Sequence, residues 1–406
     1  MSAVQRGWRH VFIKNCCEIL DGKRKPLNSV ERLSMKGEIP YYGANGVVDY
    51  INNFIFDEDL ILMAEDGGNF SDFRTRPIAY KISGKSWVNN HAHVLRAKPL
   101  FNQNFLFYSL EHKNILPVLN GGTRAKLNKS ELEKIEILVP EALSEQEKIA
   151  AILTTVDDKL DVIARQIKAT QTLKQGLMQA LFSRGMGVRD AGDWPTVALH
   201  EVAEIRTGVA KGKKGLKKPV KLPYLRVANV QDGHIDISEV KTIEVEAAQV
   251  ERYALRSGDV LMTEGGDFDK LGRGDVWEGQ ISPCLHQNHV FAVRPDPGKL
   301  DSYYLAALAA SDYGRQYFLS CAKRTTNLAS INSSQLKAFP VLLPSLAVQK
   351  NIAEIAGAAN AKVAVLEEKQ TFYQTLKRGL MQKLLTGEWR VKMEAVMLEA
   401  DAEATA

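Results

Sequence analysis

The chain has 406 residues, of which 45% are hydrophobic and 25% charged, and its formal net charge is +5. These values are ordinary for a soluble globular protein of two or three domains, and the mildly basic charge permits an anionic partner without requiring one. The four cysteines show no paired spacing, the N-terminus lacks a signal-peptide core, and no apolar run approaches the roughly 18–20 residues of a membrane span. We therefore expect a cytoplasmic protein with reduced thiols and no membrane partner.

Residues 8–140 are predicted to form a β-rich domain. Short runs of strand-forming residues, such as Phe54–Phe56 and Leu60–Met63, are separated by turns rich in Gly, Asn and Asp. Pro140 follows the last run and marks the change from strand to helix.

A long helix is predicted from about residue 143 to residue 184. Its apolar residues recur in steps of four and three, which is the heptad spacing of a coiled coil. A helix of about 40 residues would be roughly 60 Å long and cannot stand alone in water, so its seam must meet another helix or another protein. The apolar seam positions are Ile149, Leu153, Val156, Leu160, Ile163, Ile167, Leu177 and Leu181.

The second half of the chain repeats this order, with a β-rich segment over residues 194–344 and a helix over residues 346–386. The sequence LKQGLMQ at residues 173–179 returns as LKRGLMQ 203 positions later. A repeat of this length indicates a duplicated domain-plus-helix module rather than a solenoid unit. The second seam comprises Ile352, Ala356, Ala359, Val363, Leu366, Leu380 and Leu384.

The β-rich segments also correspond to each other, at offsets that change along the chain. Asn90-His91 lies 198 positions before Asn288-His289, whereas Trp8 lies 186 positions before Trp194. Loops of different length on a shared scaffold are what two different binding specificities would require.

The chain ends by restarting its own pattern, because Gly387–Val391 resembles the segments that begin each half. This suggests a closed, pseudo-two-fold arrangement. Residues 393–406 are rich in Ala and Glu and are predicted to be a disordered tail.

Several motifs occur together in this frame. Two variable β-rich segments alternate with two similar helices that end in Gly-Leu-Met-Gln, and conspicuous stretches lie at Ile39–Gly46 and Leu222–Val230. The combination resembles the specificity (S) subunits of type I restriction–modification enzymes, the HsdS family, over about residues 8–388. The second helix departs mildly from the pattern through its Ala-rich seam, which leaves open either a tighter helix approach or weaker packing.

The resemblance implies an α+β fold in which two β-rich α/β target recognition domains are separated by two long antiparallel coiled-coil helices with pseudo-two-fold (circular) symmetry. The recognition domains would occupy residues 1–142 and 186–345, the helical spacers residues 143–185 and 346–388, and a partly disordered segment residues 389–406. Each domain would read one half of a bipartite site in double-stranded DNA. The helices would set the spacing and dock two methyltransferase (M) subunits, accompanied by restriction (R) subunits. S-adenosylmethionine, ATP and magnesium would bind to those partners and not to this chain.

Basic, amide and aromatic side chains in the variable segments are the candidates for DNA contacts. Lys and Arg suit phosphates, and Asn and Arg suit bidentate contacts with base edges. The densest cluster, over residues 206–226, has eight basic residues and no acidic one. The alternatives are a solvated surface loop for this cluster and buried or turn-forming roles for the Tyr and Asn residues. The candidates are Lys23, Arg24, Lys25, Tyr41, Tyr42, Asn45, Asn69, Ser71, Arg74, Arg76, Thr123, Arg124 and Lys126 in the first half, and Lys211, Lys213, Lys214, Lys217, Lys218, Tyr224, Arg226, Asn229, Asp267, Lys270, Arg273, Arg324, Thr325, Thr326 and Asn327 in the second.

No residue is predicted to be catalytic or to bind a metal ion. The His and Cys residues near His91 and His286 lack a regularly spaced set of four ligands, and no nucleotide-binding or methyltransferase motif occurs. Asp21-Gly22-Lys23 fits a nuclease fragment but has no upstream acidic partner, so we interpret it as a turn. A chain that has recognition-type loops and no catalytic motif is expected to be a binding subunit that is not itself catalytic. Two other functions stay open: the specificity subunit of a nuclease-free methylation system, and a coiled-coil scaffold whose β domains bind protein or carbohydrate.

Overall fold

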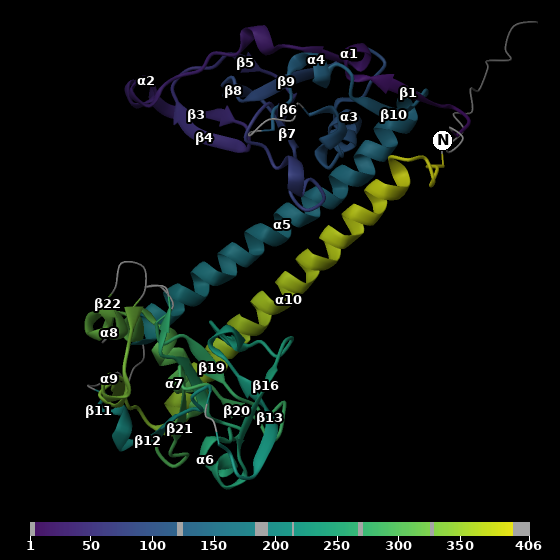
Figure 1. The fold of residues 1–406 in the computed structure, drawn as a ribbon. Helices are drawn as coiled ribbons and strands as arrows, with labels where there is room; N and C mark the ends of the chain where they lie inside the picture. Colours follow the sequence, from purple (N-terminus) through teal and green to yellow (C-terminus); the bar gives the residue numbers. More distant parts are fainter. Residues whose placement is uncertain are drawn as a thin grey trace, which may run out of the picture. The chain divides into compact units, whose positions relative to one another are not determined.

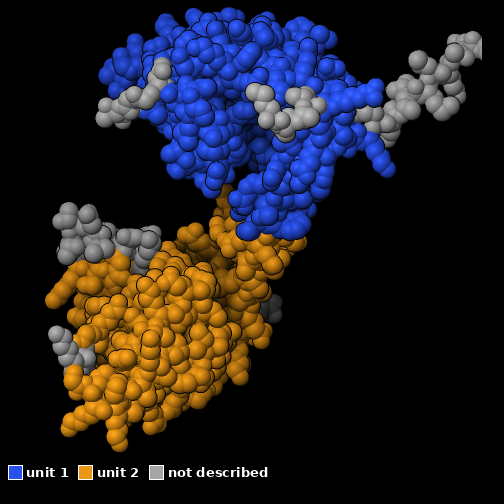
Figure 2. Space-filling view, turned by 45° about the vertical axis from the view of Figure 1, so that its right-hand side comes forward, with its two compact units in different colours: residues 1–162, 370–406 blue, residues 163–369 orange. Residues whose placement is uncertain are grey.

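The structure is a computed structural model of the chain, and it describes residues 5–119, 125–182, 194–212, 215–266, 271–324 and 329–392. The chain forms two compact units, which Figure 2 distinguishes by colour. Unit 1 comprises residues 1–162 and 370–406, and unit 2 comprises residues 163–369. Both long helices therefore begin in one unit and end in the other.

Unit 1 is built on two four-stranded sheets. The first is antiparallel with strand order β2-β9-β6-β7, and the second has the order β4-β3-β8-β5, in which β3 and β8 run parallel. The strand that opens the unit, β1, pairs with β10, the strand that leads into the long helix. The strands are β1 Trp8–Phe12, β2 Cys17–Ile19, β3 Lys36–Gly43, β4 Gly46–Ile51, β5 Phe56–Asp57, β6 Leu60–Ala64, β7 Ala79–Ile82, β8 Lys85–Val88, β9 Ala92–Ala97 and β10 Glu136–Pro140, and the helices are α1 Ile13–Cys16, α2 Ser29–Ser34, α3 Gln103–Glu111 and α4 Lys129–Leu132.

Unit 2 repeats this topology, except that its second sheet has three strands. Its first sheet has the order β12-β21-β17-β19, its second the order β16-β13-β20, and the opening strand β11 pairs with β24. The strands are β11 Thr196–Ala198, β12 Ala203–Thr207, β13 Pro219–Leu225, β14 Val230–Gln231, β15 His234–Ile235, β16 Lys241–Glu246, β17 Val260–Thr263, β18 Gly265–Gly266, β19 Gly274–Val276, β20 Leu285–His286, β21 Val290–Pro295, β22 Lys323–Arg324, β23 Ala329–Ser330 and β24 Pro340–Leu342, and the helices are α6 Val250–Tyr253, α7 Ser302–Ala310, α8 Asp312–Cys321 and α9 Ser333–Lys337.

Strand registers confirm the predicted duplication residue by residue. Tyr41 lies opposite Trp87 in the parallel pair of unit 1, and Tyr224 lies opposite Leu285 in the parallel pair of unit 2. Arg96 forms an ion pair with Glu58 at 2.6 Å, and Arg294, 198 positions later, forms one with Asp259 at 2.7 Å. The drifting offsets of the sequence are therefore differences in loop length around one repeated fold.

The long helices are α5, Leu143–Phe182, and α10, Leu346–Leu384, as Figure 1 shows. Within unit 1 the beginning of α5 and the end of α10 share a hydrophobic core that contains Ile149, Leu153, Met381 and Leu384. Within unit 2 the end of α5 packs in the same core as the beginning of α10. The helices are thus antiparallel in each unit, and every predicted apolar seam position is buried or partly buried. The expected α+β fold with two antiparallel helices is confirmed.

The segment after α10 packs against the beginning of the chain in unit 1. Arg390 makes two contacts with the buried carboxylate of Glu145, at 2.7 and 2.9 Å, and donates to the carbonyl of Arg6 at 2.9 Å. Gly387 has a φ of +69° and lies against the indole of Trp8, where an added Cβ would come within 3.1 Å of the ring. The segment that resembles a third module thus closes unit 1. The tail at residues 393–406 lies outside the described residues.

Candidate nucleic-acid interface

In unit 1 several candidate side chains meet at residues 65–69, which follow β6. The Nδ2 of Asn45 donates to the carbonyl of Gly67 at 2.8 Å. The carboxylate of Glu65 accepts from Arg24 at 2.7 Å and lies 3.1 Å from the Nζ of Lys126. Candidates from three distant parts of the sequence therefore gather around one segment, which sequence spacing alone does not reveal.

The side chain of Arg24 lies inside this cluster and not on its surface. Its side chain is only 13% exposed, because it contacts the carboxylates of Glu65 and Asp21 and donates to the carbonyl of Ala92 at 2.8 Å. Charge-assisted hydrogen bonds of this kind hold a side chain in place. Lys23 and Lys25 remain the exposed cations of this turn.

Unit 2 builds the equivalent position from the segment that begins at Glu264. The amide of Ile331 donates to the carbonyl of Glu264 at 2.8 Å, as the amide of Leu127 does to that of Glu65. Strand β18 pairs with β23, which also pairs with β22. The backbone of the candidate Arg324, in β22, is thereby placed in the same small sheet as the Gly265–Gly266 pair.

An exposed histidine–carboxylate pair occurs at the same place in both units. The Nδ1 of His91 lies 2.8 Å from the carboxylate of Asp66, and the Nδ1 of His289 contacts that of Glu264. Each histidine directly precedes a central strand, β9 or β21, and its imidazole is about half exposed, at 46% and 56%. These residues were not among the candidates from the sequence, although the repeated Asn-His dipeptide was a signal for them.

The basic loop of unit 2 is fixed at its far end by Glu246. Its carboxylate accepts hydrogen bonds from the backbone amides of Lys217 and Lys218 at 2.9 and 2.8 Å. Both lysine side chains are exposed, as is that of Lys211. The backbone is therefore held while the ammonium groups stay free to reach an anionic surface.

Three of the aromatic and amide candidates lie inside the domains, and the basic candidate Arg226 is partly buried. The hydroxyl of Tyr41 accepts from the amide of Leu27 at 2.9 Å, and Tyr224 is 3% exposed. Asn229 is also 3% exposed and donates to the carbonyls of Asp236 and Glu239. Arg226 pairs with Glu239 at 3.6 Å. For the Tyr and Asn residues, this burial matches the buried and turn-forming alternatives that the sequence left open.

The other candidates divide into exposed, partly buried and undescribed residues. The exposed ones are Lys23, Lys25, Asn45, Ser71, Arg74, Arg76, Lys126, Lys211, Lys217 and Lys218, and the partly buried ones are Tyr42, Asn69 and Arg273. Thr123, Arg124, Lys213, Lys214, Asp267, Lys270, Thr325, Thr326 and Asn327 lie outside the described residues, and so does the side chain of Arg324.

Asp21, Glu65 and His93 form the only group within the described ranges whose ligand atoms are close enough to hold a metal ion. Both ring nitrogens of His93 are engaged, with the carboxylate of Asp21 at 2.6 Å and the carbonyl of Leu127 at 2.7 Å. Arg24 and Lys126 already balance the carboxylates. The donor set therefore suits an internal ion-pair network better than a divalent cation. Asp21–Lys23 is a short 3-10 turn, as the sequence indicated.

A protein-family model accounts for the duplicated architecture. The model of the type I restriction modification DNA specificity domain matches this chain twice, at residues 5–171 and at residues 191–370. The two matches together span most of the chain and coincide with its two modules. The chain belongs to this family.

Relatives over nearly the whole length are type I specificity subunits. The chain is 27% identical to a putative type I restriction enzyme specificity subunit, S.HindORF215P, of Haemophilus influenzae, over 89% of this chain and 87% of that protein. It is 26% identical to the MjaVIII specificity subunit of Methanocaldococcus jannaschii, over 96% and 94% of the two chains. The EcoKI specificity subunit of Escherichia coli is 22% identical over 78% and 74%.

Solved structures of specificity subunits share the fold. The S subunit of a type I restriction–modification system from M. genitalium has a TM-score of 0.64 at 15% identity and covers 97% of this chain and 98% of its own. A chain from a study of complex assembly in the type I system has a TM-score of 0.53 at 16% identity, with coverage of 96% and 100%.

The family and the relatives identify a DNA-binding specificity subunit with two target recognition domains, as the resemblance predicted. None of the helices in the described ranges is long and apolar enough to cross a membrane. The candidate interface of a specificity subunit thus includes, in each unit, the segment after β6 or β17, the histidine beside it and the exposed cations of the loops.

Proposed function

We propose that this specificity subunit reads a bipartite site in double-stranded DNA, one half with each recognition domain, while its helices set the distance between the halves. Residues 1–142 and 186–345 are the recognition domains in this proposal. Residues 143–185 and 346–388 are the helical spacers, and residues 389–406 are a C-terminal segment.

The observation that carries this proposal is the identical attachment of two domains that differ in their loops. In each unit the opening strand pairs with the strand that leads into a long helix. A buried glutamine of that helix, Gln146 or Gln349, then accepts a hydrogen bond from the backbone amide of the N-cap residue of α3 or α7. Rigid attachment combined with divergent loops suits two readers of different sequence held at a set spacing.

The helices also carry repeated exposed apolar residues, which suit two equivalent partners. Val162 and Val365, 203 positions apart, are 40% and 46% exposed, and Leu173 and Leu376, at the same spacing, are 62% and 37% exposed. Exposed apolar positions that recur in a duplicated helix support the docking of two M subunits on equivalent sites. R subunits would join that complex.

In this proposal the chain itself performs no chemistry. S-adenosylmethionine, ATP and magnesium bind to the M and R subunits, and the purified chain has no methyltransferase, nuclease or ATPase activity. Turnover of S-adenosylmethionine by the pure chain would contradict this.

A domain exchange tests the assignment of half-sites. Residues 8–140 are replaced by the corresponding domain of another specificity subunit, the chain is expressed with its M subunit, and methylated adenines are sequenced. One half of the methylated sequence should change while the other half and the spacer stay the same. A change in both halves would refute independent reading.

The other functions make different predictions. A nuclease-free system would show methylation but no R subunit co-purifying with the complex. A scaffold that binds carbohydrate would bind its ligand with little dependence on salt, whereas affinity for DNA falls steeply as salt rises.

A further inference from the structure

A closely packed ion cluster joins α3, α5 and α10 in unit 1. The Nζ of Lys377 lies 2.9 Å from the carboxylate of Glu111 and 2.8 Å from that of Asp157. The hydroxyl of Tyr108 donates to Asp157 at 2.8 Å, and the Lys377 ammonium lies 5.3 Å from the centre of the Tyr108 ring. Lys377 is 12% exposed, and its charge is neutralised by its own chain.

Unit 2 keeps this lysine but replaces its partners with smaller, neutral residues. Lys174 stands 203 positions before Lys377, and the N-caps Asn102 and Asp301 align α3 with α7. By this alignment Tyr108 corresponds to Ala307 and Glu111 to Ala310, while the repeat of 203 places Asn360 at the position of Asp157. The ring and both carboxylates that surround Lys377 therefore have no counterpart at the aligned positions near Lys174.

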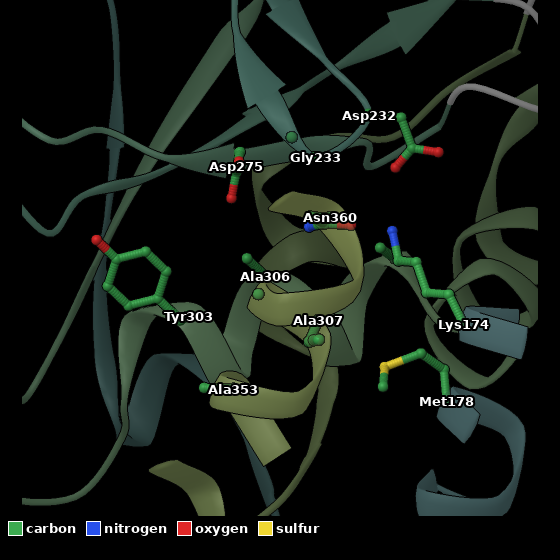
Figure 3. A pocket seen from close by; sticks show the side chains of 14 residues that line it. Lys174, Met178, Asp232, Gly233, Asp275, Tyr303, Ala306, Ala307, Ala353 and Asn360 are labelled. Atoms are coloured by element: carbon green, nitrogen blue, oxygen red, sulfur yellow. The ribbon is translucent and has the colours of Figure 1, made fainter. Parts of the chain in front are cut away.

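A cavity occupies the vacated space. It has a volume of about 70 Å³ and is lined by Lys174 and Met178 of α5, Ala307 and Ala310 of α7, and Gly357 and Asn360 of α10. Figure 3 shows Lys174 and Met178 on one side and Asp275 and Tyr303 on the other. The cavity adjoins a larger groove of about 710 Å³, which Lys174, Met178 and Asn360 also line. Ala353 and Ala356 contribute to the wall, so the Ala-rich seam gives looser packing at this point.

The charges around the cavity leave Lys174 as its accessible cation. The carboxylate of Asp232 is paired with Arg315 at 3.0 Å. Burial raises the pKa of the Asp275 carboxyl, and the positive charge of Lys174 acts in the opposite direction. No ion pair joins Lys174 to another residue of the described ranges, whereas its counterpart in unit 1 has two.

We propose that this cavity binds a small molecule that carries an aromatic ring and a carboxylate. Beside Lys174, these two groups take the place of the tyrosine ring and the carboxylates that surround Lys377 in unit 1. The carboxylate pairs with the Lys174 ammonium and accepts from the Asn360 amide. The ring lies against Met178, Ala307 and Gly357, where the phenol of Tyr108 would otherwise lie. Because the ligand joins α5, α7 and α10, its binding stabilises the helix packing of unit 2.

Calorimetric titration of the full chain with para-hydroxyphenylpropionate tests this directly. This probe carries the phenol ring and the carboxylate, and we expect saturable binding together with a rise in melting temperature. Tyramine, with the same ring but an ammonium group, should bind at least tenfold more weakly. The absence of binding by hydroxyphenylpropionate, or equal binding by tyramine, would overturn the proposal.

Two variants separate the site from general stability. Lys174→Met removes the cation and should weaken hydroxyphenylpropionate binding at least tenfold, whereas Lys168→Met, at an exposed position of the same helix, should leave it unchanged. The triple variant Ala307→Tyr, Ala310→Glu and Asn360→Asp rebuilds the unit 1 cluster and should abolish binding while raising the melting temperature. Unchanged binding by Lys174→Met would overturn the proposal even if the triple variant fails to fold.

Discussion

Gln146 and Gln349 stand 203 positions apart and make the same hydrogen bonds in the two units. The Oε1 of Gln146 accepts from the amide of Asn102 at 2.8 Å, and the Oε1 of Gln349 accepts from the amide of Asp301 at 2.8 Å. Their Nε2 atoms donate to the proline that precedes each helix, Pro140 or Pro344, at 2.9 Å. Each Nε2 also faces a second carbonyl, that of Leu100 at 3.3 Å or Lys299 at 2.9 Å. One side chain thus ties the helix, its leading strand and the N-cap of α3 or α7 together.

Replacing either glutamine by leucine should destabilise the unit that contains it. The substitution keeps the volume but leaves a buried amide and a buried carbonyl without partners, each of which costs about 1–3 kcal/mol. We expect a loss of about 3 kcal/mol in the free energy of unfolding, measured with urea. Gln179→Leu, at an exposed position of α5, is the control and should change it little. Equal stability of all three variants would show that this junction does not hold the domain.

The repeat of 203 positions relates these two glutamines to each other but does not reveal what they do. Periodicity predicts which positions of α5 and α10 are buried, because a helix presents every third or fourth residue to one side. It does not predict that position 146 meets the N-cap of α3, since the loop around Leu100 has no periodic signal. The residues equivalent by repeat are therefore predictable from the sequence, whereas their partners are not.

The basic loop should contribute salt-dependent and sequence-independent affinity for DNA. In the double variant Lys217→Gln and Lys218→Gln, the backbone bonds to Glu246 are kept and two positive charges are removed. If both lysines contact phosphates, the slope of log affinity against log salt should become less steep by about 2. The measurement is a salt titration of binding to specific and to random DNA in complex with the M subunit. An unchanged slope would place these lysines away from the phosphates.

His286 should make unit 2 sensitive to acid. Burial lowers its pKa to about 4 from the ordinary 6.5, although its Nδ1 contacts the carbonyl of Tyr253 at 3.2 Å. Between about pH 6.5 and pH 4, His286 is protonated in the unfolded chain but neutral in the folded unit. The free energy of unfolding therefore falls as the pH drops toward 4. The full shift corresponds to about 3 kcal/mol.

The variant His286→Val introduces the residue that stands at the equivalent place in unit 1, where Val88 lies opposite Tyr42 in the parallel strand pair. Urea unfolding of unit 2 at several pH values between 4 and 7 should show a flatter pH dependence in the variant, whatever its absolute stability. The same slope in both proteins would assign the acid sensitivity to other groups.

The burial of Tyr41, Tyr224 and Asn229 shows a second limit of the sequence. Their motif placed them on conspicuous stretches, yet all three are buried, the hydroxyl of Tyr41 accepts from the amide of Leu27, and the Nδ2 of Asn229 donates to the carbonyl of Asp236. A motif residue that shapes a loop and one that contacts a base have the same sequence signature. Only the hydrogen-bond partners distinguish them.

Exposed and buried leucines of the helices should respond differently to a charge. Leu173→Asp and Leu376→Asp place a charge at exposed, repeated positions, so the chain should fold normally but lose affinity for the M subunit. Leu366→Asp, at a position 2% exposed, should cost more than about 3 kcal/mol of stability. Thermal unfolding and pull-downs with the M subunit measure the two effects. Normal binding by both exposed variants would move the docking surface elsewhere.

The helices should act as a ruler between the half-sites. One heptad inserted into α5 between Val162 and Ile163, and one into α10 between Lys369 and Gln370, preserves the seam and falls at the boundary between the units. Each helix becomes longer by about 10 Å and its end turns by only about 20°. Because a base pair rises about 3.4 Å, the unread spacer should grow by about three base pairs if the helices lie along the DNA and by one or two if they cross it obliquely. Sequencing of methylated adenines reads the spacer directly, and both half-sites should be unchanged.

A chain of unaltered length with the same residues substituted in place of native heptads is the control. Methylation at the original spacing by the longer chain would show that the helices do not set the distance.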